Sequence, residues 1–134
     1  MQSRFIDLKL TSGEHLILNI AYISQITATH GDDFLNGVDV VFLALGDEGL
    51  LMASVPASQV AELLQVVSES NSPFLDIKPI GGQRLILNKD YITHISPTYG
   101  NSLTDGADVS VWGTVVQVPA SGVAAISKLL QPAA

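Results

Sequence analysis

The sequence contains no cysteine among its 134 residues. This excludes disulfide bonds, thiolate metal ligands and a cysteine nucleophile. Basic residues are also scarce, with six Lys and Arg in total and a net charge of −7 at pH 7. Binding to nucleic acids and to anionic membranes depends on clustered basic side chains. Because these six are scattered along the chain, we expect neither a nucleic acid nor a membrane as a partner.

Long apolar runs are missing as well. The longest one, residues 40–45, is far shorter than the roughly 20 residues that a transmembrane helix needs. Residues 1–11 alternate between polar and apolar types, which differs from the apolar stretch of a secretory signal. We therefore expect a soluble, cytoplasmic protein. Its hydrophobic content of 47% is sufficient for a packed core.

Motifs of common catalytic and cofactor sites are absent. No Gly-x-Gly-x-x-Gly or Walker pattern occurs. Ser121 lies in Pro-Ala-Ser-Gly-Val, which lacks the first glycine of a nucleophile elbow. His30, Asp32 and Asp33 share one loop, but residues of these types are also typical of a solvated turn. We expect no catalytic residue, no cofactor and no metal site.

The most informative feature of the sequence is an internal repeat. When residues 5–40 are shifted by 69 positions onto residues 74–109, 16 of the 36 aligned pairs are identical. The longest identical stretch is Leu-Ile-Leu-Asn, at residues 16–19 and 85–88. We interpret the chain as a tandem duplication of one unit, and we expect the two copies to pack as a pseudo-two-fold pair.

The repeat also predicts the domain organisation. Val-Pro-Ala-Ser recurs at 55–58 and 118–121, at a shorter offset of 63. Between the copies, residues 69–73 have no apolar periodicity and are predicted to form a linker. The repeat units are then residues 1–68 and 74–134. A unit of this size would be marginally stable alone, so we expect one compact domain.

Each unit is predicted to contain about five short strands followed by one helix. Strict alternation of polar and apolar side chains is typical of half-buried strands. It predicts a strand near residues 4–10, and the turn signal at Ser12-Gly13 predicts a hairpin to the next strand. The strands of the first unit are then expected near 4–10, 16–18, 22–29, 38–45 and 50–55, and the counterparts of the last two near 107–112 and 115–118. Val60, Leu63 and Val67 lie on one helical face, with Ser58 as the predicted N-cap and Ser121 as its counterpart.

These elements define an α+β fold with antiparallel sheet. Two arrangements of the units stay open. Their sheets either pack face to face or join edge to edge.

The order of turn, core and helix positions resembles that of the small flagellar FlbD-type family. The matching residues are Gly13, Leu18, Asn19, Ile23, Ile26, Gly46 or Gly49, Val55, Ser58 and Val60, and again Gly82, Leu87, Asn88, Ile92, Ile95, Gly113, Val118, Ser121 and Val123. The acidic residue that this family has after Ile-x is replaced by Ser24-Gln25 and Thr93-His94. The resemblance implies an accessory, non-enzymatic protein.

Three sets of residues are candidates for more than core packing. A stripe of Phe5, Asp7 and Lys9 recurs as Phe74, Asp76 and Lys78. It serves either in strand pairing between the copies or as an exposed contact surface. Phe34 and Leu103 occupy the centres of matched loops, where they either enter the core or contact a partner. Asp39 and Asp108 are expected to accept backbone hydrogen bonds from these loops.

Two functions follow from these observations. We favour a non-enzymatic protein-interaction or assembly module, with a protein partner or self-association, and with Phe34, Leu103, Phe5 and Phe74 as contacts. The alternative is a small-molecule or sensory domain with a cleft between the copies. Its candidate lining residues are Tyr22, Tyr91, His30, Tyr99 and Trp112.

Overall fold

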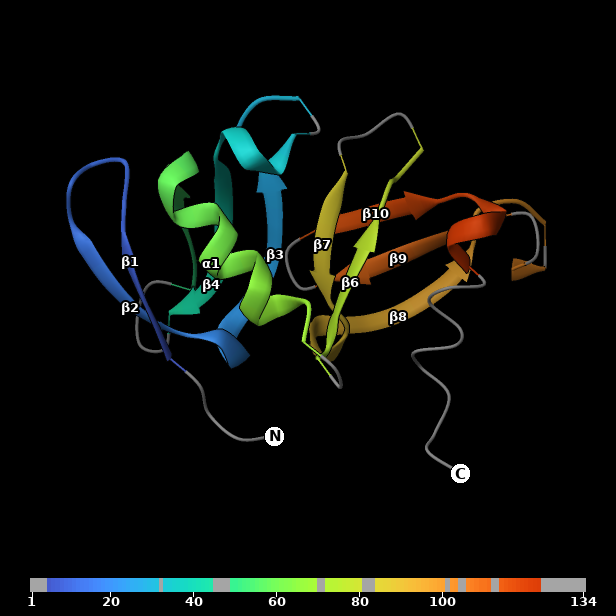
Figure 1. The fold of residues 1–134 in the computed structure, drawn as a ribbon. Coiled ribbons are helices and arrows are strands. Elements are labelled where there is room, and N and C mark those ends of the chain that lie inside the picture. The colour runs from blue at the N-terminus through green and yellow to red at the C-terminus, as the bar shows by residue number, and fades with distance from the viewer. Residues whose placement is uncertain are drawn as a thin grey trace.

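The computed structural model describes residues 5–31, 33–44, 49–69, 72–80, 84–100, 102–103, 106–111 and 114–123. Within this part the fold is α+β, and its strands form antiparallel sheets (Figure 1). The strands are β1 (Phe5–Lys9), β2 (His15–Asn19), β3 (Ile23–Ala28), β4 (Val38–Ala44), β5 (Gly49–Val55), β6 (Phe74–Ile77), β7 (Leu85–Asn88), β8 (Ile92–Pro97), β9 (Ala107–Val111) and β10 (Thr114–Val118). The helices are α1 (Ala57–Val67) and the short 3-10 helices η1 (Ile20–Tyr22), η2 (Phe34–Asn36) and η3 (Lys89–Tyr91).

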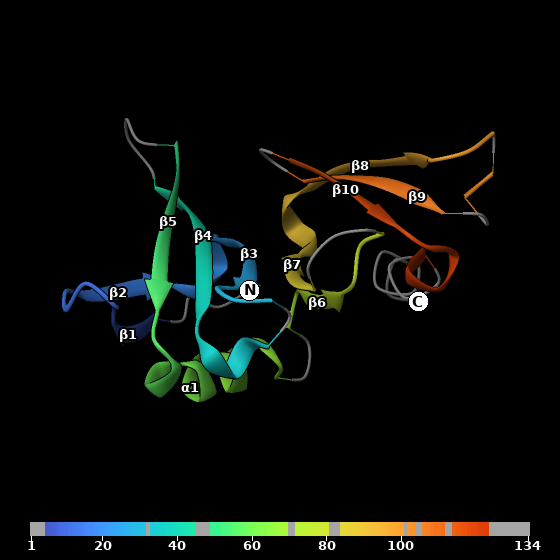
Figure 2. The same cartoon turned by 90° about the horizontal axis from the view of Figure 1, so that it is seen from above.

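The central sheet contains strands from both halves of the chain. Its order is β5-β4-β3-β7-β6, flanked by the separate hairpin β1-β2 and by the sheet β10-β9-β8. The two halves are thus joined edge to edge, through antiparallel pairing of β3 with β7. Hairpin β1-β2 and strand β8 lie at opposite ends of the molecule (Figures 1 and 2).

The strand predictions of the sequence analysis are confirmed to within one or two residues. The start of α1 differs from its prediction, because the helix begins at Ala57 and has Pro56 as its N-cap. Ser58 therefore lies inside the first turn, and no side chain caps this helix. Ser121 is likewise not a cap, since the helical residues 120–123 begin before it.

The 3-10 helices, which the sequence did not predict, set the path between strands. Asn19 accepts a hydrogen bond from Ala21 N through Oδ1 at 3.0 Å, and this cap begins η1. Asn88 does the same for Asp90 N at 2.9 Å and begins η3. Each asparagine therefore turns the chain from a hairpin into the next strand.

A glycine immediately precedes each of the strands β4 and β9. Gly37 has φ 119° and ψ 151°, a backbone region that only glycine adopts readily. Gly106 has φ 125°, and a Cβ there would lie 3.1 Å from Val118 O. Both positions bring the loop close to the neighbouring strand.

Asp39 and Asp108 were predicted to bind loop backbone, and this prediction is wrong in detail. Asp39 Oδ1 accepts from Thr29 Oγ1 at 3.1 Å and from Ser54 Oγ at 2.9 Å. Asp108 Oδ1 accepts from Thr98 Oγ1 at 2.8 Å. Each carboxylate thus binds the threonine that follows the preceding strand, through a hydroxyl group rather than through the loop backbone.

Two hydrophobic cores meet at β7. The first core lies between α1, hairpin β1-β2 and the sheet, and contains Ile86 from the second half. The second core lies under β8–β10 and contains Leu85 and Leu87. Since successive side chains on a strand point to opposite faces, β7 is buried on both sides and contributes to each core.

Side-chain hydrogen bonds support the β3–β7 pairing. Asn88 is fully buried, and its Nδ2 donates to Ile23 O at 2.7 Å. The hydroxyl of Tyr91 donates to Ala21 O at 3.2 Å. These bonds satisfy polar groups that the contact removes from water.

Replacing Gly37 should destabilise the fold strongly. Gly37→Ala places a Cβ 3.3 Å from Val55 O in a backbone conformation that alanine disfavours. We expect the free energy of unfolding to fall by about 1–3 kcal/mol in urea titrations. The control is Gly13→Ala, which shares a positive φ (92°) but has no atom within 4 Å of the new Cβ, so the difference between the variants reports the close approach to Val55 O. An equal or smaller loss for Gly37→Ala would contradict a destabilising contact with Val55 O.

The two capping asparagines should differ in their contribution to stability. Asn19→Ala removes a helix cap, which typically costs about 1 kcal/mol. Asn88→Ala removes an equivalent cap and also leaves Ile23 O buried without its partner, for a further cost of about 1–3 kcal/mol. Chemical denaturation of both variants measures the difference. Equal losses would show that the bond to Ile23 O contributes nothing.

Candidate interaction surface

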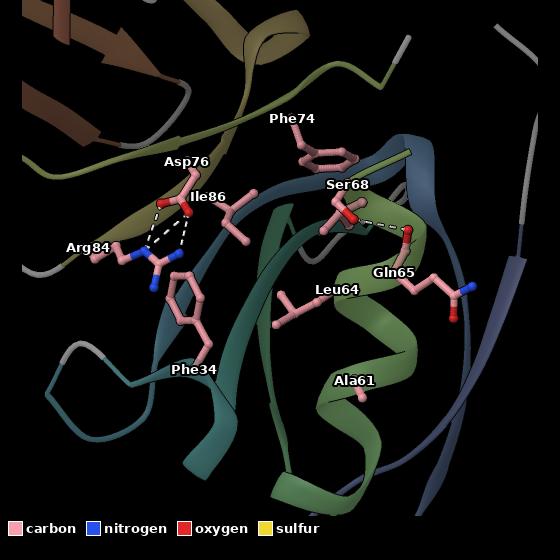
Figure 3. Close-up of a pocket in the computed structure, with 10 residues that line it drawn as sticks. Phe34, Ala61, Leu64, Gln65, Ser68, Phe74, Asp76, Arg84 and Ile86 are labelled. Atoms are coloured by element: carbon pink, nitrogen blue, oxygen red, sulfur yellow. Dashed lines mark hydrogen bonds and ion pairs between the residues drawn. The ribbon is translucent and has the colours of Figure 1, made fainter. Parts of the chain in front are cut away.

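A hollow separates α1 from the second hairpin, β6-β7, and so lies between the two halves of the chain (Figure 3). Its volume is about 330 Å³, and most of its surface is apolar. The lining residues are Phe34, Ala61, Leu64, Gln65, Val67, Ser68, Phe74, Asp76, Arg84 and Ile86. The outward face of the second hairpin therefore points at the first half.

An ion pair lies at the side of this hollow. The Arg84 guanidinium donates to both carboxylate oxygens of Asp76, with Nε 2.9 Å from Oδ1. The same guanidinium stacks over the Phe34 ring, 4.5 Å from its centroid (Figure 3). Arg84 thus links the second hairpin to η2 through a charged contact and a cation–π contact.

The two central loop residues have different environments. Phe34 is only 4% exposed and belongs to the first core, so it is a core residue rather than the exposed contact that the sequence analysis considered. Its counterpart Leu103 is 38% exposed. Part of this difference arises because Arg84 covers the Phe34 ring.

The predicted stripe has two different settings. Phe74 packs against the first core, and Asp76 faces the hollow. Phe5 is 62% exposed, and Asp7 contacts His15 at 3.2 Å on its own hairpin. The stripe does not pair strands between the two halves of the chain, because β1 pairs with β2 and β6 with β7.

The described residues among those proposed for a cleft do not line this hollow, although Tyr91 lines a separate one together with Leu43 of the first half. The hydroxyl of Tyr91 donates a hydrogen bond to Ala21 O. Desolvation by burial raises the pKa of Tyr91, and the charges of Tyr22 and Asp90 raise it further. Tyr22, His30 and Tyr99 are exposed elsewhere on the described surface. Trp112 lies outside the described residues.

In the loop of His30, Asp32 and Asp33, which the sequence analysis weighed as a metal site, Asp33 makes hydrogen bonds within the loop. Asp33 caps η2 by accepting from Leu35 N and from Asn36 Nδ2, each at 3.0 Å. Asp32 lies outside the described residues. Among the residues that are described, no three His, Asp or Glu side chains gather as a metal-binding group.

Sheet edges offer a different kind of surface. A loop residue touches one outer strand of each of the two larger sheets, since Thr11 N donates to Ser54 O on β5 and Ile80 N to Gln117 O on β10. Among the described strands, β1, β2, β6 and β8 also have only one strand partner each, which is β1 for β2 and β9 for β8. Strands β2 and β8 therefore leave one edge each without a strand partner.

An apolar side chain stands beside the open edge of β2. Ile17 is 68% exposed, whereas its counterpart Ile86 is 7% exposed. Sequence reasoning did not identify this residue as a contact. The available signal was the uninterrupted Leu16-Ile17-Leu18, because continuous apolar runs are typical of strands buried on both faces.

No helix in the described part of the chain has both the length and the hydrophobicity needed to cross a membrane. Searches for relatives identify none. No protein-family model, no curated protein and no solved structure matches this chain.

Proposed function

We propose that the chain is a non-enzymatic assembly module made of two copies of one β-rich unit. It binds a protein partner by strand addition along β2. The observation that carries this proposal is the exposed Ile17 beside an edge without a strand partner. The resemblance to the FlbD-type family supports the same non-enzymatic class.

Matched local features support the view of two copies. Asn19 and Asn88 cap equivalent 3-10 helices. The Thr29–Asp39 bond has its counterpart in Thr98–Asp108, and Gly37 and Gly106 share an unusual positive φ. The bond from Thr11 N to Ser54 O corresponds to that from Ile80 N to Gln117 O, at the offsets of 69 and 63.

A protein partner suits the chemistry of the β2 surface. Single exposed apolar side chains are common and carry little meaning by themselves. Here Ile17 and Phe5 lie on the same face of one hairpin, next to backbone groups that can pair with a further strand. Strand addition uses this combination, because the backbone provides affinity and the side chains provide specificity.

A small-molecule site in the hollow is the second candidate. An apolar space of about 330 Å³ between α1 and hairpin β6-β7 is of a size that a small metabolite fills. Arg84 and Asp76 at its side could orient a polar group of such a ligand.

Replacing Ile17 with lysine should weaken partner binding strongly. The charge would enter the centre of the proposed contact, and loss of such a residue weakens binding by about 2 kcal/mol or more, roughly 30-fold. Affinity capture from native extract, followed by titration of the captured protein, measures the effect. The matched control is Met52→Lys on β5, which is also well exposed. Equal capture by both variants and the wild type would contradict the role of β2.

Filling the hollow should abolish ligand binding if the second candidate is correct. Ala61 is exposed and lines the hollow, so Ala61→Trp adds volume there without displacing a buried side chain. A metabolite that raises the melting temperature of the wild type should leave that of the variant unchanged. If no metabolite shifts the wild type, the small-molecule function is excluded for the panel tested.

A further inference from the structure

We infer that the partner of strand β2 is strand β8 of a second copy of this chain. Ile17 lies opposite Ile95, Leu18 opposite His94 and Leu16 opposite Ser96. This inference rests on the proposed assembly function and deepens it by naming the partner and the register.

The register comes from the contact already present inside the chain. There β3 pairs with β7, with Gln25 opposite Leu87, Ile26 opposite Ile86 and Thr27 opposite Leu85. Subtracting 69 from the residue numbers of β7 gives β2, and adding 69 to those of β3 gives β8. Each molecule therefore carries one further copy of each of these two strands, at its two ends.

The exposure of β2 fits this role. Leu18 is buried in the first core, as Leu87 is in the second core. Ile86 crosses to the core of the other half, whereas Ile17 points to solvent. Ile17 therefore has no second core to pack into within its own chain. The second core of another copy would bury Ile17 as the first core buries Ile86.

The side chains of β8, the proposed partner strand, are correspondingly less buried than those of β3. Ile23 and Ile26 on β3 are fully buried, while Ile92 and Ile95 on β8 are only partly buried. Leu103 is exposed, whereas its counterpart Phe34 is covered by Arg84. His15 is the counterpart of Arg84, and its contact with Asp7 repeats the pair of Arg84 with Asp76.

The amide of Asn19 at the end of β2 also has a matching acceptor on β8. Asn19 Nδ2 has no hydrogen-bond partner among the described residues, whereas Asn88 Nδ2 binds Ile23 O. In the pair of copies, Asn19 Nδ2 would donate to Ile92 O. Pro97 on β8 lacks a backbone N–H, but it lies beyond the three paired positions and does not interrupt them.

One chain cannot make this contact with itself, because its hairpin β1-β2 and its strand β8 lie at opposite ends (Figures 1 and 2). A contact between two different surfaces generates a ring when its rotation closes and a filament when it does not. The edges of β5 and β10 are already touched by loops. Strands β1 and β6 also have one strand partner each among the described strands, and the internal β3–β7 register is what assigns the contact between copies to β2 and β8.

Disulfide trapping tests the register. The chain has no native cysteine, so Ile17→Cys and Ile95→Cys can be made as single variants and mixed. We expect a disulfide-linked pair of the two variants under oxidising conditions. The control mixes Ile17→Cys with Ile92→Cys, which moves the thiol about 10 Å along β8 and should give no such pair. Equal trapping of both mixtures would overturn the inference.

Oligomeric mass provides the second measurement. Light scattering over a concentration series should give masses above the 14.2 kDa of one chain for the wild type, and 14.2 kDa for Ile17→Lys. Because Ile17 is exposed, this variant should keep the wild-type circular dichroism spectrum. A monomeric wild type at every concentration, without register-specific trapping, would refute pairing between copies.

The same variant separates this inference from the proposed function. If the purified chain stays monomeric but capture of a different protein still depends on Ile17, the assembly function stands and the second copy is not the partner. If Ile17→Lys changes neither mass nor capture, both the inference and the proposed function fail.

Discussion

Pairing of β3 with β7 is the contact on which the rest of the structure depends. It joins the two halves into one sheet and places β7 between two hydrophobic cores. Ile86 completes the first core, while Leu85 and Leu87 complete the second. Because a domain of this size has little stability in excess, neither half can lose this strand without exposing its own core.

Asn88 explains why this contact is specific as well as apolar. A buried amide without partners costs free energy, so the strand fits only where both its donor and its acceptor are satisfied. Ile23 O and Asp90 N provide these partners. A shift of one residue would also move Ile86 to the opposite face, which would empty one core and overfill the other.

Local patterns in the sequence predicted the elements well, for physical reasons that are themselves local. Alternation in residues 5–9 and the apolar face of Val60, Leu63 and Val67 predicted β1 and α1, because these periods follow from backbone geometry. Three-residue helices such as η1 were missed because they are too short to show a period. Edge-to-edge joining was left open, since it depends on which strand reaches β3 and not on any single segment.

Equivalent positions in a repeat do not guarantee equivalent environments, and the candidate site shows this most clearly. Phe34 and Leu103 align in sequence, yet Arg84 covers only the first of them. Ile17 and Ile86 belong to identical tetrapeptides, yet the first is 68% exposed and the second 7%. Sequence alone could show that these positions match, but only the placement of β7 reveals which member of each pair has its partner.

The position of β7 in the chain also has a consequence for synthesis. A ribosome completes β3 well before residues 85–87, so the edge of β3 and the core beside it first exist without their cover. During that interval, a hairpin from a neighbouring nascent chain with the same Leu-Ile-Leu-Asn sequence can take the place of β7. Correct folding is therefore a competition in time. Its outcome depends on how quickly residues 74–88 emerge compared with how often two growing chains on one messenger meet.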